Sequence, residues 1–235
     1  MEFLSEKEDE FSGPVVALEE NEIENMCKLA NLSKKDVFFD LGCGWGEIVR
    51  YALKKYHVKE SNGIEYDVKR FLLAIELTRN EFSKNELKKI EFWRSYYQDF
   101  DCSKATVIYN GLYTFADSEE IEYYEKISKK KSIKIMKRDL PLYPYQPIKV
   151  HRDEKGSWFF LMKTPLHKYR IKDKTKWAQR VLGKSNVTIN DVYDYYYNKL
   201  YDRFLNEYIG NKKGAKKVAI EGLRDLKKQI RNSSH

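Results

Sequence analysis

The residues best able to do chemistry lie in one short segment, Asp40-Leu41-Gly42-Cys43-Gly44-Trp45-Gly46, in which three glycines alternate after an acid. Glycines let a chain turn sharply and let a ligand lie against bare backbone. The amide groups of a helix that follows such a turn suit a carboxylate or a phosphate, and the Asp40 carboxylate can accept a hydrogen bond from an ammonium group. The spacing GxGxG differs from the GxGxxG of dinucleotide sites. It favours a loop for a cofactor with an ammonium group, which NAD lacks, over the alternative of a surface hairpin.

Glu65 is the second candidate, because it follows the glycine turn by about 20 residues, the spacing at which a carboxylate binds the ribose of a nucleotide cofactor. It ends a short strand candidate, residues 62–66, and can accept hydrogen bonds from two ribose hydroxyls. Tyr66, beside it, can lie on the face of an adenine. The alternative is an ordinary surface glutamate that opens the next helix, where an acid also favours the helix dipole.

The elements that would position these residues alternate between strand and helix over residues 14–163. Short apolar runs predict buried strands at residues 37–41, 62–66, 90–93, 106–109, 133–136 and 158–162. Apolar side chains at three- and four-residue spacing predict helices at residues 19–30, 47–53, 67–82 and 117–128. In the third helix the expected apolar face contains Phe71, Leu72, Ile75 and Leu77. The pattern predicts an α/β protein with a doubly wound, Rossmann-like sheet whose last strands form an antiparallel edge.

Four segments together resemble class I methyltransferases: DLGCGWGE from Asp40, GIEYD around Glu65, SYY at residues 95–97 and TVIYNGLYTF at residues 106–115. Within that class the chain is most similar to the non-SET lysine methyltransferases, namely the disruptor-of-telomeric-silencing histone methyltransferases and the small archaeal protein lysine methyltransferases. The resemblance covers residues 14–165. It implies a seven-stranded methyltransferase sheet, S-adenosylmethionine as cofactor, and methyl transfer to a lysine of a protein substrate, with chromatin or other nucleic-acid-bound proteins as candidates.

For the cofactor, the resemblance implies contacts with three parts of the chain. Asp40 and the glycine turn line the methionine end, and Glu65 holds the ribose. Ser95 and Tyr96 lie near the adenine, although the family more often has Asp or Asn at the position of Ser95. The expected cofactor-binding residues are therefore Asp40, Gly42, Cys43, Gly44, Gly46, Glu65, Tyr66, Ser95 and Tyr96.

For the substrate, the resemblance places Asn110 beside the transferred methyl group, although a gapless alignment brings the family's asparagine to Gly111. Trp158 and Phe159 would form walls of a lysine channel, and Tyr109 is one of the aromatic residues expected around it. Methyl transfer from a sulfonium to an amine requires no metal and no nucleophilic side chain, so no metal site is expected. The enzyme must orient the reactants and keep water from the lysine, and aromatic walls do both.

Two other functions stay open. An RNA or small-molecule methyltransferase would use the same fold, with the C-terminal region binding RNA. Methyltransferases that act on the amino groups of bases usually carry Asn/Asp-Pro-Pro-aromatic after the fourth strand, where this chain has Tyr109-Asn110-Gly111-Leu112. The other alternative is a non-catalytic module that binds DNA, although such a module has no need for both the glycine turn and Glu65.

The net charge of +8 is concentrated in the C-terminal third. Residues 164–235 carry 17 Lys and Arg against 7 Asp and Glu, whereas the preceding part has 27 against 29. A basic region of this kind predicts contact with DNA or RNA, with solvated helix faces as the alternative. Residues 189–209 and 215–231 have helix periodicity. We therefore expect a methyltransferase domain at 1–165 and a basic helical extension at 166–235.

Composition narrows the expected cellular location. No apolar run reaches the roughly 20 residues that a membrane span needs, and the first residues are acidic and polar rather than like a signal peptide. The three cysteines form no CxxC pair, which argues against a disulfide framework and a structural zinc site. We expect a cytoplasmic or nucleoid-associated protein that binds no membrane.

Overall fold

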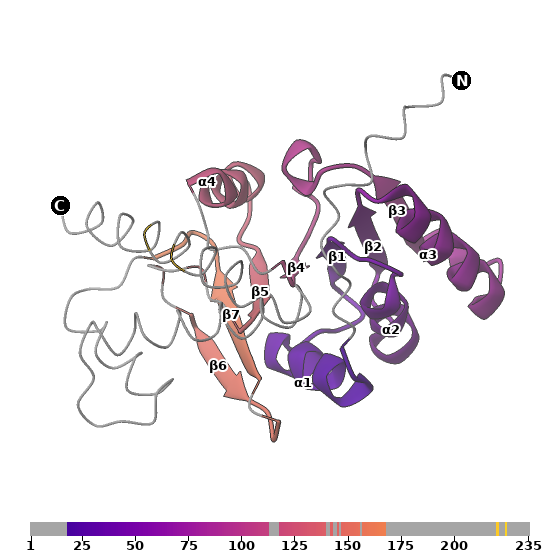
Figure 1. Cartoon of the computed structure of the whole chain (residues 1–235), viewed down its shortest axis with the longest axis horizontal. Helices are drawn as coiled ribbons and strands as arrows, with labels where there is room; N and C mark the ends of the chain where they lie inside the picture. The colour runs from indigo at the N-terminus through magenta and orange to yellow at the C-terminus, as the bar shows by residue number, and fades with distance from the viewer. Residues whose placement is uncertain are drawn as a thin grey trace.

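A seven-stranded sheet flanked by helices forms the frame of the protein (Figure 1). The computed structural model describes residues 18–112, 118–139, 147–155 and 157–167, together with Leu142, Tyr145, Ile220 and Arg224. The helices are α1 (Glu20–Ala30), α2 (Glu47–Tyr56), α3 (Val68–Glu81) and α4 (Ser118–Ile127). The strands are β1 (Val37–Leu41), β2 (Glu60–Glu65), β3 (Ile90–Arg94), β4 (Val107–Asn110), β5 (Lys134–Arg138), β6 (Lys149–Arg152) and β7 (Trp158–Lys163).

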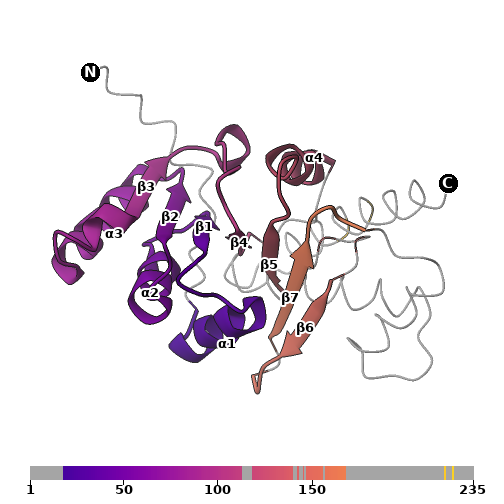
Figure 2. The same cartoon turned by 180° about the vertical axis from the view of Figure 1, so that it is seen from behind.

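The strand order is β3-β2-β1-β4-β5-β7-β6. Strands β3 to β5 in this order run parallel, whereas β7 pairs antiparallel with both β5 and β6. Because β1 lies between β2 and β4, the chain reverses its direction of winding at β1, which is the point where open α/β sheets bind ligands. The predicted doubly wound sheet with an antiparallel edge is confirmed, and Figure 2 shows that edge from behind.

Helices cover both faces of the sheet. Side chains of α1 and α2, such as Met26 and Val49, pack in one core cluster with Phe38, and side chains of α4, such as Tyr124, pack in another with Phe39. Consecutive residues of a strand point to opposite faces, so Phe38 and Phe39 enter different clusters. This burial on both faces explains why every residue of β1 is buried and why all but Asp40 are apolar.

The apolar face predicted for α3 is confirmed only in part, because Phe71 and Ile75 are half-buried whereas the two leucines are exposed. Leu72 is 58% exposed and Leu77 is 37% exposed, and the buried residues of this helix are Ala74 and Thr78. The helix packs close to the glycine turn, because the Ala74 Cβ lies only 3.2 Å from the place that a Cβ on Gly46 would occupy. Small side chains are therefore needed on the face of α3 that meets the sheet.

Strand β6 was not predicted, because its sequence Lys-Val-His-Arg contains no apolar run. Its pairing with β7 along Lys149 to Arg152 defines it instead. The helices predicted at 189–209 and 215–231, and the extension from residue 166, lie outside the described residues, except that Leu166 and His167 are described and that Ile220 and Arg224 are helical. Among the described residues, no helix is both long and apolar enough to cross a membrane.

Candidate active site

The glycine turn joins the end of β1 to the start of α2. Gly42, Gly44 and Gly46 have φ values of 77°, 54° and 72°, in the left-handed region that favours glycine. At Gly46 a Cβ would also stand 2.6 Å from the ring of Phe92. The amides of Gly42 and Cys43 donate to the Ile64 carbonyl at 2.8 and 3.0 Å, which ties the turn to β2. The shape of the turn is therefore fixed by backbone conformation and by hydrogen bonds.

Glu65, at the end of β2, holds the middle of the turn. Its Oε2 accepts a hydrogen bond from the Gly44 amide at 2.8 Å, and its Oε1 accepts one from the Asp67 amide at 2.9 Å. An ionised carboxylate has about four acceptor positions, so Glu65 can accept two further hydrogen bonds. The buried carboxylate thus both fixes the turn and fits the two hydroxyls of a ribose.

Asp40 lies on β1 between Gly63 of β2 and Tyr109 of β4, and it is only 2% exposed. Burial and the charge of the neighbouring Glu65 raise the pKa of the Asp40 carboxyl well above its usual range. A cationic ligand beside Asp40 would favour its ionised form and relieve this penalty. Two buried carboxylates at one turn therefore fit a nucleoside that carries an ammonium group and a sulfonium.

Cys43 fills space within the turn. Its Sγ lies 2.7 Å from the place that a Cβ on Gly63 would occupy. Burial and the nearby Asp40 charge raise the pKa of the Cys43 thiol well above its usual range. The thiol therefore stays protonated, and its role here is packing.

Tyr66, Ser95 and Tyr96 surround the far side of Glu65. The rings of Tyr66 and Tyr96 are stacked with centroids 3.9 Å apart and an interplanar angle of 18°. No third ring fits between them, so an adenine at this place would lie on an outer face of the pair. Tyr96 is half exposed, and the Ser95 Oγ donates to the Tyr96 carbonyl at 2.9 Å. The structure brings these predicted residues together beside the end of β2, because the Ser95 amide also donates to the Glu65 carbonyl at 3.3 Å.

Asn110, at the end of β4, lies next to Leu41 at the start of the turn, but its side chain is fully buried. Its Nδ2 donates to Glu120 Oε1 and to the Tyr124 hydroxyl, both at 2.9 Å, and its Oδ1 accepts from the Leu112 amide at 2.9 Å. Asn110 therefore spends its hydrogen-bonding groups on the protein, although the sequence places it beside the methyl group.

Leu112 is a site residue that the sequence reasoning missed. Its Cδ2 lies 2.9 Å from the place that a Cβ on Gly42 would occupy, so its side chain covers the first glycine of the turn. Three buried polar side chains behind it were missed as well: Glu120, Tyr124 and Lys137. The sequence gives no signal for them, because β5 reads Lys-Ile-Met-Lys-Arg and nothing in it marks Lys137 as the buried lysine.

The aromatic residues predicted around the substrate are divided between two faces of the sheet. Phe159 is fully buried in the same core cluster as Tyr109, on the side of α1 and α2. Trp158 points the other way, as consecutive strand residues do, and its ring stacks on Phe160 with centroids 6.4 Å apart. The structure therefore does not bring Trp158 and Phe159 onto one wall.

Trp158 nevertheless lies at the edge of the sheet where the parallel strands have their carboxyl ends. It forms two hydrogen bonds with Asp139, which directly follows β5. The Trp158 amide donates to the Asp139 side chain at Oδ1 at 2.9 Å, and the Asp139 amide donates to the Trp158 carbonyl at 2.7 Å. The carboxyl end of β5 is the edge at which the glycine turn also lies, because β1, β4 and β5 are parallel.

Comparisons with known proteins agree with this geometry. The sequence model of the family described as "Histone methylation protein DOT1" matches residues 10–110. A protein-lysine N-methyltransferase of Saccharolobus islandicus is 26% identical over 145 residues, which cover 61% of this chain and 87% of that protein. The crystal structure of an RNA methyltransferase from Salinibacter ruber in complex with S-adenosyl-L-homocysteine superposes with a TM-score of 0.54 at 20% identity, covering 66% of this chain and 97% of that chain.

The likeness to the Salinibacter ruber protein concerns the fold, and the match to the DOT1 family covers the glycine turn and Glu65. The turn, the two buried carboxylates and the switch in winding at β1 all fit the same cofactor. The chain is therefore a class I methyltransferase related to the lysine methyltransferases, and S-adenosylmethionine is its cofactor.

Proposed function

We propose that this methyltransferase acts on lysine side chains of proteins. The observation that carries the proposal is the relationship to the protein-lysine N-methyltransferase of Saccharolobus islandicus, because the aligned region includes almost the whole of that protein. The match to a family named for histone methylation supports the same class of substrate.

The contacts of Asn110 favour an aliphatic amine over the amino group of a base. The amino group of a base is a weak nucleophile, since its lone pair is shared with the ring. Hydrogen-bond acceptors beside its protons make it more nucleophilic. The Asn110 side chain is fully buried, and its oxygen, the atom that would accept from a base, already accepts from the Leu112 amide. A neutral lysine amine is a strong nucleophile by itself and needs orientation and exclusion of water.

The chain's own residues would then divide the work. Glu65 accepts hydrogen bonds from the ribose, and Asp40 accepts one from the ammonium group of the cofactor, which supplies an activated methyl group on its sulfonium. The lysine amine loses a proton to water before it attacks. Apolar surroundings favour this loss, because they lower the pKa of the amine. The lone pair of the lysine nitrogen forms the new N–C bond. At the same time the C–S bond of the cofactor breaks, and the electron pair of that bond returns to sulfur.

The substrate class is tested with methyl-labelled cofactor and a whole-cell extract. Digestion of the labelled products with protease or with nuclease distinguishes protein from nucleic acid, and hydrolysis of the protein fraction identifies methylated lysine. We expect protease-sensitive label that the Glu65→Ala variant fails to produce. Nuclease-sensitive label would instead support the RNA methyltransferase alternative.

We also propose that the basic residues after 165 hold the enzyme on nucleic acid near its protein substrate. The charge excess of the region from residue 164, 17 basic against 7 acidic residues, supports this. Binding of duplex DNA should weaken steeply with salt, because bound phosphates release counterions. Deletion of residues 166–235 should flatten that salt dependence, and an unchanged slope would contradict the proposal.

A further inference from the structure

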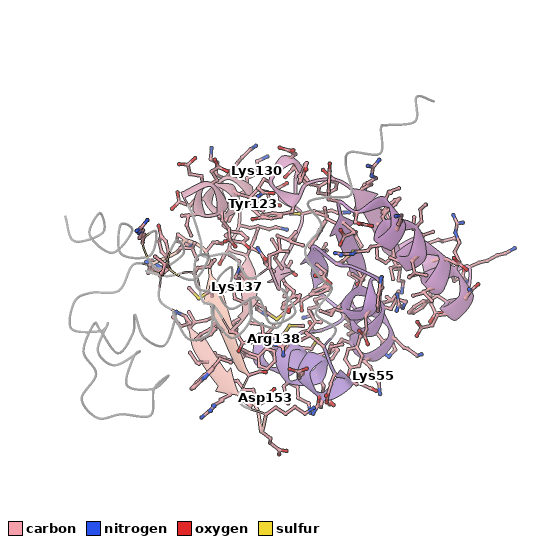
Figure 3. The ribbon with its side chains drawn as sticks, viewed as in Figure 1. Lys55, Tyr123, Lys130, Lys137, Arg138 and Asp153 are labelled. Carbon is pink, nitrogen blue, oxygen red and sulfur yellow. The ribbon has the colours of Figure 1, made fainter. Side chains whose placement is uncertain are left out.

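A buried ion pair lies behind the cofactor crevice. Lys137 of β5 and Glu120 of α4 have side chains that are only 1% and 2% exposed, and Nζ lies 3.2 Å from Oε1. In Figure 3 Lys137 lies in the middle of the molecule, whereas Lys55 and Lys130 lie toward its rim. Lysine is almost never fully buried unless it is paired, and the burial of both charges removes much of the stabilising value of the pair. This position therefore calls for a role other than stability.

The hydrogen bonds of the pair lead to the loop that leaves β4. Lys137 Nζ also donates to the Leu112 carbonyl at 3.2 Å. Glu120 Oε1 accepts from Asn110 Nδ2, and the Asn110 Oδ1 accepts from the Leu112 amide. Both polar groups of the Leu112 backbone are thus held, one directly by Lys137 and the other through Asn110 and Glu120.

Leu112 is the point where this network meets the cofactor crevice. The Leu112 side chain packs over Gly42, at the beginning of the glycine turn. Gly111 and Leu112 belong to no helix or strand, so regular secondary structure does not fix their backbone. Asn110 restrains the Leu112 amide from within this segment, and the Lys137 ammonium supplies the restraint on the Leu112 carbonyl.

We propose that Lys137 is a positioning residue for the methyltransferase reaction: its ammonium group holds the Leu112 carbonyl and so fixes the Leu112 side chain against the glycine turn. The role concerns the cofactor crevice and is independent of the proposed lysine substrate. An ammonium has three donors in a compact group, so Lys137 can bind Glu120 and the Leu112 carbonyl at once. A charge-assisted hydrogen bond is shorter and stronger than a neutral one.

The test compares three variants by binding of S-adenosylhomocysteine and by thermal unfolding. Lys137→Met removes the ammonium and leaves the Glu120 charge buried. The double variant Lys137→Met/Glu120→Gln removes both charges and keeps an acceptor for Asn110 and Tyr124. Lys134→Met is the matched control, because Lys134 lies on the same strand and donates to the Ala30 carbonyl at 2.7 Å, away from the crevice.

We expect Lys137→Met to lower the affinity for S-adenosylhomocysteine by about tenfold, the effect of one hydrogen bond from a charged group. The double variant should recover stability while its affinity stays low, because the Leu112 carbonyl is still unheld. Hydrogen exchange at the Leu112 amide should become faster in both variants. Lys134→Met should lower the unfolding temperature without changing the affinity.

Recovery of the affinity together with the stability in the double variant would overturn the proposal, because it would show that charge pairing alone matters. Wild-type affinity in the single variant would overturn it as well. If the single variant does not fold, the double variant decides between the two roles. If the labelling experiment showed a substrate other than protein lysine, these binding measurements would still test the role of Lys137.

Discussion

Two polar clusters at the carboxyl edge of the sheet differ in how their charges are balanced. In the first, Asp40 and Glu65 bring two carboxylates to the glycine turn, and the donors to Glu65 are backbone amides. In the second, behind β4 and β5, the Glu120 carboxylate faces the Lys137 ammonium. The first cluster raises the pKa of its own aspartate, while the second is neutral within itself.

The difference shows that two clusters at one edge of a sheet can have different roles: one binds the ligand and the other fixes the conformation of a loop. A pair of buried carboxylates destabilises the free protein and becomes favourable when a cation arrives, so it belongs to ligand binding. A self-neutralised cluster gains nothing from a ligand, and it acts by holding the loop at Leu112. Changes in the first cluster should therefore act on affinity, and most changes in the second should act on stability.

The largest effect should follow Glu65→Ala. The change removes the partner of the Gly44 amide and the carboxylate that we propose accepts from two ribose hydroxyls. Two lost hydrogen bonds to a charged group correspond to a loss of affinity of about 100-fold or more, measured by isothermal titration with S-adenosylhomocysteine. Glu91→Ala, on the neighbouring strand β3 with an exposed side chain, is the control and should bind normally. Undiminished binding by the Glu65 variant would remove the first cluster from the cofactor site.

The next effect concerns Asp40 and depends on pH. Because the pKa of Asp40 is raised in the free protein and ligand binding favours its ionised form, the affinity for S-adenosylmethionine should increase as pH rises above the usual aspartate pKa of about 4. Asp40→Asn should lower the affinity at neutral pH by about tenfold and remove this pH dependence. Titrations in buffers of different ionisation enthalpy should show proton release in the wild type alone.

The same variant should be more stable than the wild type in the absence of ligand. A raised carboxyl pKa in the folded state means that folding stability is lost as pH rises through that pKa. The gain from Asp40→Asn should therefore be small near pH 4 and grow with rising pH, as thermal unfolding would measure. A variant that is less stable at every pH would contradict the balance of charges described for the first cluster.

A smaller effect, on stability alone, should follow Tyr124→Phe in the second cluster. Its hydroxyl accepts from Asn110 Nδ2 and donates to Glu120 Oε1 at 3.1 Å. The loss of both bonds should lower the free energy of unfolding by about 1–2 kcal/mol and leave the affinity for S-adenosylhomocysteine unchanged. Tyr123→Phe is the control from the same helix, because it removes a hydroxyl that bonds with the Phe100 carbonyl and with the Cys102 side chain, outside the second cluster. A large loss of affinity in Tyr124→Phe would contradict the assignment of affinity to the first cluster and stability to the second.

The smallest effect should be seen at an exposed ion pair far from both clusters. Lys54 of α2 pairs with Glu81 at 2.7 Å, and its side chain is largely exposed. Because exposed ion pairs contribute little, Lys54→Ala should change the unfolding temperature by no more than about 1–2 °C and leave the affinity unchanged. A clear loss of either would show that charge effects are not confined to the two clusters.

The first cluster could be predicted from the sequence because its parts are local. The glycine turn and Glu65 are set by a strand, a turn and the next strand along the chain, and residue spacing records them directly. The second cluster lies on elements that are equally close along the chain, β4, α4 and β5, but no known motif marks it. Which side chains of Asn110, Glu120 and Lys137 meet depends on how α4 packs on the sheet, and the sequence does not record that packing.

The errors of sequence reasoning have the same origin. The spacing of leucines in α3 indicated an apolar face, but the glycine turn beneath the helix admits only small residues such as Ala74. Strand β6 lacks an apolar run, and its partner β7 defines it. The side-chain direction of Asn110 likewise depends on neighbours that the sequence does not reveal.

The ring of Phe92 has a consequence for how this protein can evolve. It occupies the space that a side chain on Gly46 would need, and also the space that a side chain on Gly63 would need, with distances of 2.6 Å in both cases. Gly46 must also stay glycine for its left-handed backbone, but Gly63 is limited by its neighbours alone, the Phe92 ring and the Cys43 sulfur. A larger residue at position 63 therefore requires smaller ones at positions 92 and 43, so in a collection of related sequences these three positions should vary as a linked set.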